Sequence, residues 1–234
     1  MYINKSGRHY CEQPEQSSRV SRAAGFTILE LMIASAVFAI ILLVVAVGVI
    51  SFTNSYYKGI TSSDAQATAR AIMSEVSQSL EFGQNWTKLS ANGAVDGYCV
   101  DNTLYSYELG QQVTNSSPNS SQDQGYHGLV VTNGSASCQA VTPSLPNSAT
   151  LPASSRELLN QNMRLGAFDI TQVENQLFSI RVEVIYGDND LLSNSSSLPN
   201  LGATQWGSES CAGGTGSQFC AVSDLTTTVE QRLI

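Results

Sequence analysis

The sequence predicts an α+β fold in which a long N-terminal helix packs on an antiparallel β-sheet. Three patterns carry this prediction. A run without any charged side chain, residues 31–52, is followed by a one-sided apolar stripe within residues 69–80, and apolar and polar side chains alternate through residues 178–186. The first two patterns are typical of one helix in two environments, and the third is typical of a half-buried strand.

The charge-free run is long enough to cross a membrane. Residues 26–50 contain one charged side chain, Glu30, and about 20 apolar residues suffice for a helix to span a bilayer. We therefore expect a transmembrane helix over residues 26–52. Residues 1–25 carry four basic and two acidic side chains, whereas the remainder carries seven basic and seventeen acidic ones. Basic residues beside a first span favour the cytoplasm, so we expect the topology N-in and C-out.

The helix is expected to continue beyond the membrane. Its apolar side chains repeat at the spacing of one helical face: Ala69, Ile72, Met73, Val76 and Leu80. Gly83 then supplies a stop, which makes the helix about 85 Å long at 1.5 Å per residue. The expected parts of the chain are residues 1–25 ahead of the span, the span 26–52, an amphipathic continuation 53–82, and a β-rich globular domain 83–234 outside the membrane.

Strands are expected after the helix. The alternation from Phe178 to Tyr186 is the strongest signal, and weaker candidates are residues 98–100, 104–109, 128–132, 167–173 and 226–229. The short connections between them favour antiparallel pairing. Residues 156–165 predict a short helix, with Ser154 or Ser155 as its N-cap.

Four of the five cysteines lie in the part that we expect to be exported: Cys99, Cys138, Cys211 and Cys220. An even number of cysteines in an oxidising compartment indicates disulfides. Three connectivities are possible, and we prefer Cys99 with Cys138 and Cys211 with Cys220 because they close the nearest neighbours. A zinc site is the alternative, but no CxxC pair or nearby histidine completes one.

The junction before the span differs from an ordinary secretory signal in where its apolar core lies relative to the cleavage site. An ordinary secretory signal places its apolar core before the cleavage site, whereas here the apolar core follows Gly25. Cleavage after Gly25 would remove a cytoplasmic leader and leave a new, mostly protonated α-amino group on Phe26. Glu30 is costly inside lipid, by about 2.5–3.5 kcal/mol, and such groups usually have a partner. The amine could pair with Glu30 within one helix or between neighbouring subunits.

Residues 25–30, Gly-Phe-Thr-Ile-Leu-Glu, resemble the processing motif of type IV prepilins and of type II secretion pseudopilins. The resemblance implies that a membrane-embedded prepilin peptidase cuts after Gly25 and N-methylates Phe26. It also implies that Glu30 neutralises the N-terminus of an adjacent subunit during assembly, and that the whole chain has a pilin-like fold. The segment from Cys211 to Cys220 likewise resembles the disulfide-bounded loop of many pilins.

One departure from the family pattern bears on the type of pilin. Major pilins commonly have a proline near the middle of the membrane helix, whereas this chain has no proline between Pro14 and Pro118. This favours a minor pilin or a pseudopilin over the abundant structural subunit.

Other candidate sites are few. His127 is the single histidine after residue 25, and no nucleophile motif accompanies it, so we expect neither an enzyme nor a cofactor. Asp188, Asn189 and Asp190 are candidate calcium ligands, although we prefer an ordinary turn. The glycine-rich residues 213–217 lack a P-loop lysine, and we interpret them as a flexible crossing between two cysteines. A net charge of −10 after residue 25 argues against nucleic-acid binding.

The expected function follows from the resemblance. We predict a minor pilin of a type IV pilus, acting in filament assembly or initiation, or at the tip in adhesion or motility. A pseudopilin of a type II secretion or DNA-uptake filament is the alternative, and a monomeric signal-anchored binding protein ranks third. The expected partners are the prepilin peptidase, other pilin subunits, the assembly platform and, before assembly, membrane lipid. We expect the inner membrane first, and then an extracellular pilus or a periplasmic pseudopilus.

Overall fold

A computed structural model describes residues 25–90, 95–114, 126–134, 141–146, 151–193 and 210–232. The chain divides into two compact units, Met1–Gly48 and Val49–Ile234. The described elements are the α-helix α1 (Ile28–Phe82), the strands β1 (Trp86–Ser90), β2 (Val95–Val100), β3 (Thr103–Glu108), β4 (Leu129–Asn133), β5 (Ser155–Glu157), β6 (Met163–Glu174), β7 (Leu177–Tyr186) and β8 (Ala221–Glu230), and the short 3-10 helices η2 (Asn189–Leu191) and η4 (Ser217–Phe219).

The long N-terminal helix is confirmed. α1 contains 55 residues and ends at Phe82, where the sequence predicts its end. Gly83 closes its last turn by donating its backbone N–H to the carbonyl of Ser79 at 2.8 Å. A Cβ atom at position 83 would lie 2.7 Å from that same carbonyl oxygen, so the close approach requires glycine.

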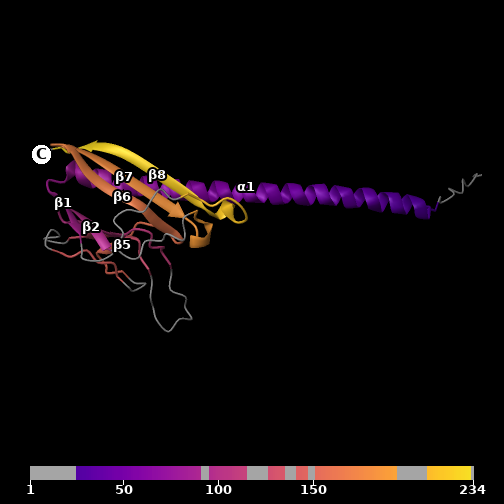
Figure 1. Cartoon of the computed structure of the whole chain (residues 1–234), viewed down its shortest axis with the longest axis horizontal. Coiled ribbons are helices and arrows are strands. Elements are labelled where there is room, and N and C mark those ends of the chain that lie inside the picture. Colours follow the sequence, from indigo (N-terminus) through magenta and orange to yellow (C-terminus); the bar gives the residue numbers. More distant parts are fainter. Residues whose placement is uncertain are drawn as a thin grey trace, which may run out of the picture. The chain divides into compact units, whose positions relative to one another are not determined.

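The strands form two antiparallel sheets, so the fold class is confirmed, with two sheets where the sequence predicted one. One sheet has the order β1-β2-β3-β4-β5, and the other has the order β6-β7-β8, whose strands Figure 1 shows side by side. A short parallel bridge between Leu109 and Leu165 joins the sheets, and the backbone N–H of Gly110 donates to the carbonyl of Leu165 at 2.8 Å.

The predicted helix at residues 156–165 is wrong. Ser155–Glu157 is strand β5, and β6 begins at Met163. β5 pairs with β4 through Thr132 and Ser155, Val131 and Arg156, and Val130 and Glu157. Asn162 adopts a positive φ of 64°, which ends any helical path before β6. Pairing with β4 therefore overrides the local helix signal at β5. Strand β1, which the sequence pattern did not indicate, forms by pairing with β2.

One hydrophobic core joins the second half of α1 to both sheets. Phe168 of β6 lies edge-on between two rings of the other sheet, with its centroid 5.5 Å from that of Tyr98 and 5.1 Å from that of Tyr107. The backbone N–H of Ile170 also donates to the Tyr98 hydroxyl at 3.2 Å. These contacts hold the sheets together through aromatic packing and one buried hydrogen bond.

Polar side chains also bind α1 to the rest of the domain, at Thr68 and at Ser79. Asn160 donates from its amide nitrogen to the Thr68 hydroxyl at 3.0 Å, and the Ser79 and Tyr105 hydroxyls are 2.7 Å apart. Burial raises the pKa of Tyr105 to about 12, so its hydroxyl stays protonated and neutral in this contact at ordinary pH. The second half of α1 is therefore an integral part of the folded domain.

Candidate functional site

The first turn of α1 begins directly after the predicted cleavage position. Thr27 precedes the first helical residue, Ile28, and its Oγ1 accepts a hydrogen bond from the backbone N–H of Glu30 at 3.2 Å. Its carbonyl accepts a second bond from the N–H of Leu31 at 3.1 Å. A threonine followed three residues later by a glutamate is the sequence pattern of a capping box. Thr27 is thus the N-cap, a role that this pattern could have indicated in advance.

Glu30 occupies the first helical turn and is exposed. The free N–H groups at a helix N-terminus carry a partial positive charge, which a carboxylate in the first turn stabilises by about 0.3–1 kcal/mol. An α-amino group on Phe26 would add a full positive charge close to the same helix end. The carboxylate of Glu30 thus compensates the start of its own helix and remains accessible to a cation from another molecule.

The two residues of the predicted cut are accessible. Phe26 is 81% exposed, and a Cβ atom added to Gly25 would have no atom within 4 Å apart from its chain neighbours. The chain itself therefore does not restrict the side chain at position 25, and any requirement for glycine there would come from the peptidase. Cleavage after Gly25, methylation of Phe26 and the charge pair of Phe26 with Glu30 stay predictions.

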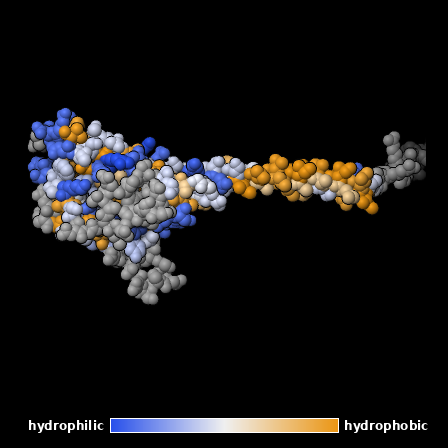
Figure 2. All heavy atoms as spheres, in the orientation of Figure 1, coloured by the Kyte–Doolittle hydropathy of each residue, from blue (hydrophilic) through white to orange (hydrophobic). Residues whose placement is uncertain are grey.

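The helix surface that follows is apolar on all sides. α1 is long and apolar enough to cross a membrane. Figure 2 shows its first part as a continuous hydrophobic surface. The large apolar side chains from Leu31 to Ile50 are all at least half exposed, from 50% for Val37 to 67% for Leu43. Within the described chain nothing covers them, so they require lipid or other subunits.

The disulfide loop near the C-terminus is the second predicted feature. Cys211 and Cys220 are bonded, with their Cα atoms 5.7 Å apart, so this pairing is confirmed. Cys99 is also disulfide-bonded, but Cys138 lies outside the described residues and the predicted pair stays a prediction. The loop contacts α1, because the Thr61 hydroxyl donates to the carbonyl of Gln218 at 3.1 Å.

Two of the three candidate calcium ligands, Asp188 and Asn189, accept hydrogen bonds from the chain's own side chains. The guanidinium of the buried Arg164 donates to the side-chain oxygen of Asn189 and, at 2.7 Å, to the carbonyl of Gly187. Gln112 donates to a carboxylate oxygen of Asp188 at 3.0 Å. The side-chain oxygen of Asn189 thus already faces the cation of Arg164, and a carboxylate oxygen of Asp188 already accepts from a neutral amide.

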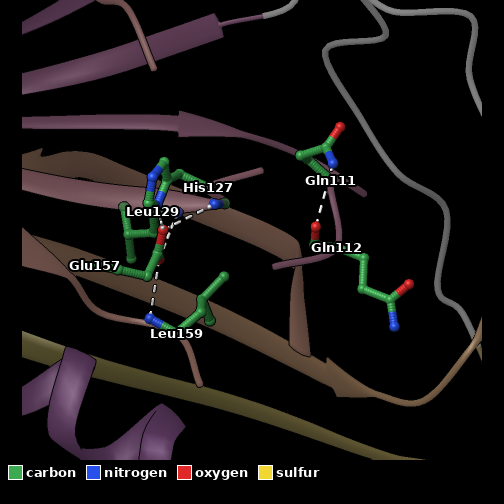
Figure 3. A network of polar contacts seen from close by, with 7 residues as sticks. Gln111, Gln112, His127, Leu129, Glu157 and Leu159 are labelled. Atoms are coloured by element: carbon green, nitrogen blue, oxygen red, sulfur yellow. Dashed lines mark hydrogen bonds and ion pairs between the residues drawn. The ribbon is translucent and has the colours of Figure 1, made fainter. Parts of the chain in front are cut away.

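A carboxylate that no sequence pattern indicated, that of Glu157, lies in the first sheet with its side chain 13% exposed. Figure 3 shows Glu157 beside His127, Leu129 and Leu159. Its two oxygens accept the N–H groups of Leu129, Leu159 and Gly128, each at 3.0 Å, and one oxygen lies 3.2 Å from His127 Nδ1. Burial raises the pKa of Glu157, and these neighbouring donors lower it by less. The cluster holds β4 to β5 and leaves His127 buried.

The single N-terminal apolar helix and the α+β head fit a membrane-anchored protein. Residues 20–46 match the family described as the prokaryotic N-terminal methylation motif, which is the hallmark of type IV pilin-like prepilin proteins. The resemblance seen at residues 25–30 is therefore confirmed. The motif implies processing by a prepilin peptidase and assembly with pilins. Neither curated proteins nor solved structures gave a match to the chain.

Proposed function

We propose that the chain is a minor pilin of a type IV pilus, acting in filament assembly or initiation, or at the tip in adhesion or motility. One observation carries the proposal. Directly after Gly25 and Phe26 comes an apolar helix that is exposed on all sides and whose first turn contains the single charged residue of its first 30 residues, Glu30. Such a surface suits both lipid residence and side-by-side packing with other pilins.

The assembly step uses geometry and charge. After cleavage, the α-amino group of Phe26 in one subunit meets the Glu30 carboxylate of its neighbour. Two unit charges 4 Å apart attract by about 1 kcal/mol in water and by about 4 kcal/mol at an effective dielectric constant of 20. Apolar helices gain little from leaving lipid for each other, because lipid is as apolar as they are. The charge pair therefore sets the axial register, which apolar packing alone leaves open.

Topology and location follow the charge pattern. The leader with its net charge of +2 stays in the cytoplasm, and the remainder with its net charge of −10 lies outside the inner membrane until assembly. The assembly platform and other pilins then take the subunit into an extracellular pilus. The absence of a proline from the membrane helix supports a minor rather than a major subunit.

A pseudopilin of a type II secretion or DNA-uptake filament is the second candidate, because it would share the same motif and helix. Neighbouring genes distinguish the two. Genes for pilus retraction and adhesion support a minor pilin, whereas genes for secretion partners with an outer-membrane secretin support a pseudopilin.

We further propose that the protein acts without catalysis. The carboxylate beside His127 already binds three backbone N–H groups, which suits a structural role better than an acid–base role. A monomeric signal-anchored binding protein would need no cut after Gly25. Mass spectrometry of the mature N-terminus separates it from a pilin, because a filament subunit begins at N-methylated Phe26 and an uncut chain retains Met1.

Glu30→Ala tests the assembly step. Processing should continue, whereas incorporation into filaments should fall, because a neighbour's amine loses its partner. Ser35→Ala is the matched control: it removes another exposed polar side chain from the same helix, one that bonds only the carbonyl of Met32 in the described structure. Immunoblots of sheared filaments and membranes measure both steps. Normal incorporation of Glu30→Ala would remove the charge-pairing mechanism, and an uncut wild-type chain would remove the proposed function.

A further inference from the structure

An aromatic cluster lies at the end of the charge-free part of α1. Phe52 and Tyr56 stack with their ring centroids 6.3 Å apart, and Tyr57 contacts Phe219 of the disulfide loop at 5.3 Å. The exposed fractions are 73% for Phe52, 59% for Tyr56, 43% for Tyr57 and 42% for Phe219. Despite these mutual contacts, the cluster leaves much of its aromatic surface uncovered.

The disulfide loop differs in charge from the domain that carries it. Residues 211–220 contain no charged side chain, whereas the chain after residue 25 has a net charge of −10. Figure 1 shows the segment that leads into β8 lying against α1, in agreement with the hydrogen bond from Thr61 to Gln218. On α1, Lys58 follows Tyr57 directly and lines a hollow together with the loop residues Gly214–Gln218. Lys58 therefore places a cation at the hollow between α1 and the loop, whereas the acidic Asp188 lines a separate hollow beside Phe219.

An open hollow of about 680 Å³ lies beside Lys58. It is lined by Asn54, Ser55, Lys58 and the loop residues Gly214–Gln218. Gly214 and Gly216 have φ angles of 118° and 91°, and the N–H groups of Gly214, Thr215 and Gly216 donate to no other backbone carbonyl in the described part of the chain. Lys58 forms no ion pair with the described residues. An ammonium group beside such N–H groups suits a phosphate oxygen.

The position of the cluster along the helix matches the outer face of a bilayer. The 27 residues from Leu31 to Tyr57 are uncharged and lie between Glu30 and Lys58. As a helix they extend about 40 Å, which is close to the 40–45 Å of a bilayer with its headgroup regions. Aromatic side chains concentrate at this interface, and lysine extends its ammonium group toward it.

We propose that Phe52, Tyr56, Tyr57, Lys58 and Phe219, with the adjoining hollow, form an interfacial seat on the outer leaflet of an anionic phospholipid membrane. The aromatic rings lie among the headgroups and upper acyl chains, while Lys58 and the loop N–H groups bind headgroup phosphate. The disulfide loop thus contacts lipid while the subunit waits for assembly. This inference rests on the membrane residence in the proposed function and not on the type of filament.

Tryptophan fluorescence of the full chain in vesicles of phosphatidylethanolamine and phosphatidylglycerol tests the seat. Three variants each add one tryptophan: Phe219→Trp in the loop, Tyr126→Trp at an exposed head position, and Phe38→Trp in the span. The parent spectrum is subtracted because the chain has two native tryptophans. Lipids brominated near the headgroup should quench Phe219→Trp and shift its emission to the blue, and should leave Tyr126→Trp unchanged. Acyl-chain bromine should quench Phe38→Trp in every inserted sample.

The outcomes are distinguishable. Quenching of Phe38→Trp without quenching of Phe219→Trp overturns the seat and leaves membrane residence intact, whereas loss of both contradicts membrane residence itself. A blue shift of Phe219→Trp that grows with protein density and not with brominated lipid would mean that a second copy covers the loop, which also overturns the seat.

Lys58→Gln tests the phosphate contact in the Phe219→Trp background. Quenching of the loop tryptophan by nitroxide-labelled phosphatidylglycerol should weaken in Lys58→Gln. The matched control is Arg70→Gln, which removes an exposed cation higher on the same helix and should behave like the parent. Equal weakening in both variants would reduce the effect to general charge attraction and remove Lys58 from the seat.

Discussion

The two halves of α1 have the same backbone geometry and opposite surroundings. Every buried residue of the helix lies between Thr61 and Leu80, and residues 28–60 contain none. In the second half, the small side chains of Ala65 and Ala69 allow close packing, and larger ones complete the core with the two sheets. In the first half, the large apolar side chains from Leu31 to Ile50 point in all directions, and each is at least half exposed in the described chain.

The difference shows that hydrophobicity alone does not indicate where a helix is buried. An apolar stripe with polar residues between its members is satisfied within one chain, whereas a helix that is apolar on all sides is not. Covering a large aliphatic or aromatic side chain is worth about 1.5–3 kcal/mol. Moving the uncovered first half out of water would therefore gain free energy on the order of tens of kcal/mol. Lipid or neighbouring subunits must supply the apolar surroundings.

Placing a carboxylate in each half of α1 should reveal the largest difference between them. Val76→Asp puts a charge at a position that is 0% exposed, which should cost the head more than about 4 kcal/mol and unfold it. Ile41→Asp should leave the unfolding temperature of the head unchanged and add about 2.5–3.5 kcal/mol to membrane insertion. Near-UV circular dichroism measures the first effect, and membrane fractionation measures the second.

Gln78→Asp is the control for the charge itself, because this residue is an exposed neighbour of Val76 on the same helix. It should melt like the parent. If Ile41→Asp destabilised the head as much as Val76→Asp does, the two halves would not be energetically separate and the comparison would fail.

Removing apolar volume gives a smaller and matched test. Leu80 is 1% exposed and Leu42 is 52% exposed in the same helix. Leu80→Ala leaves a cavity in the core and should lower the free energy of unfolding of the head by about 2–5 kcal/mol. Leu42→Ala should leave it unchanged. Denaturant unfolding in detergent, followed by tyrosine and tryptophan emission, measures both, and an equal loss would contradict the assignment of Leu80 to the core.

Opening the disulfide loop tests how much it stabilises the buried half of α1 where that half begins, at Thr61. Replacing Cys211 and Cys220 by serine opens a loop with a sequence separation of 9 residues. The chain-entropy model gives a loss of about 3 kcal/mol for a loop of this size. Because Thr61 bonds the loop at Gln218, amide exchange should increase most around residues 57–61 of α1 and least around residues 72–76. Uniform exchange along the helix would mean that the loop does not fasten it.

Local patterns account for most of the fold. The helix end at Phe82, the stripe from Ala69 to Leu80 and the strand around Ile180 follow from periodicity and from one glycine, because each depends on neighbours in the sequence. Strand β5 does not, because Ser155–Glu157 becomes a strand only through pairing with β4. The division into two sheets was equally inaccessible, since it depends on contacts such as that of Phe168 with Tyr98.

The candidate site was predictable where it is a linear motif. Gly25, Phe26 and Glu30 are adjacent in sequence, and the capping role of Thr27 was readable from the same six residues. The contact of Phe219 with Tyr57 was not readable, because more than 150 residues separate the two rings. Glu157 also gave no signal, since its donors are backbone N–H groups, which every sequence supplies.

The smallest expected effect concerns pH and lies wholly in the covered half. Burial raises the pKa of Glu157 above its ordinary value, so the folded protein holds this proton more tightly than the unfolded chain does. The contribution of Glu157 to stability is therefore fully present in acid, below the pKa of the unfolded chain, and is lost as the pH rises through the folded pKa. Glu157→Gln cannot titrate and should lack this slope.

Unfolding temperatures of the parent and of Glu157→Gln, measured from about pH 4 to pH 7, test this directly. The stability of the parent relative to the variant should fall as the pH rises, and the exposed control Glu174→Gln should run parallel to the parent. The sign decides between two physical effects on one carboxylate. A difference that grows with pH would mean that the N–H groups of Gly128, Leu129 and Leu159 outweigh burial, in which case the cluster would stabilise β5 most when Glu157 is charged.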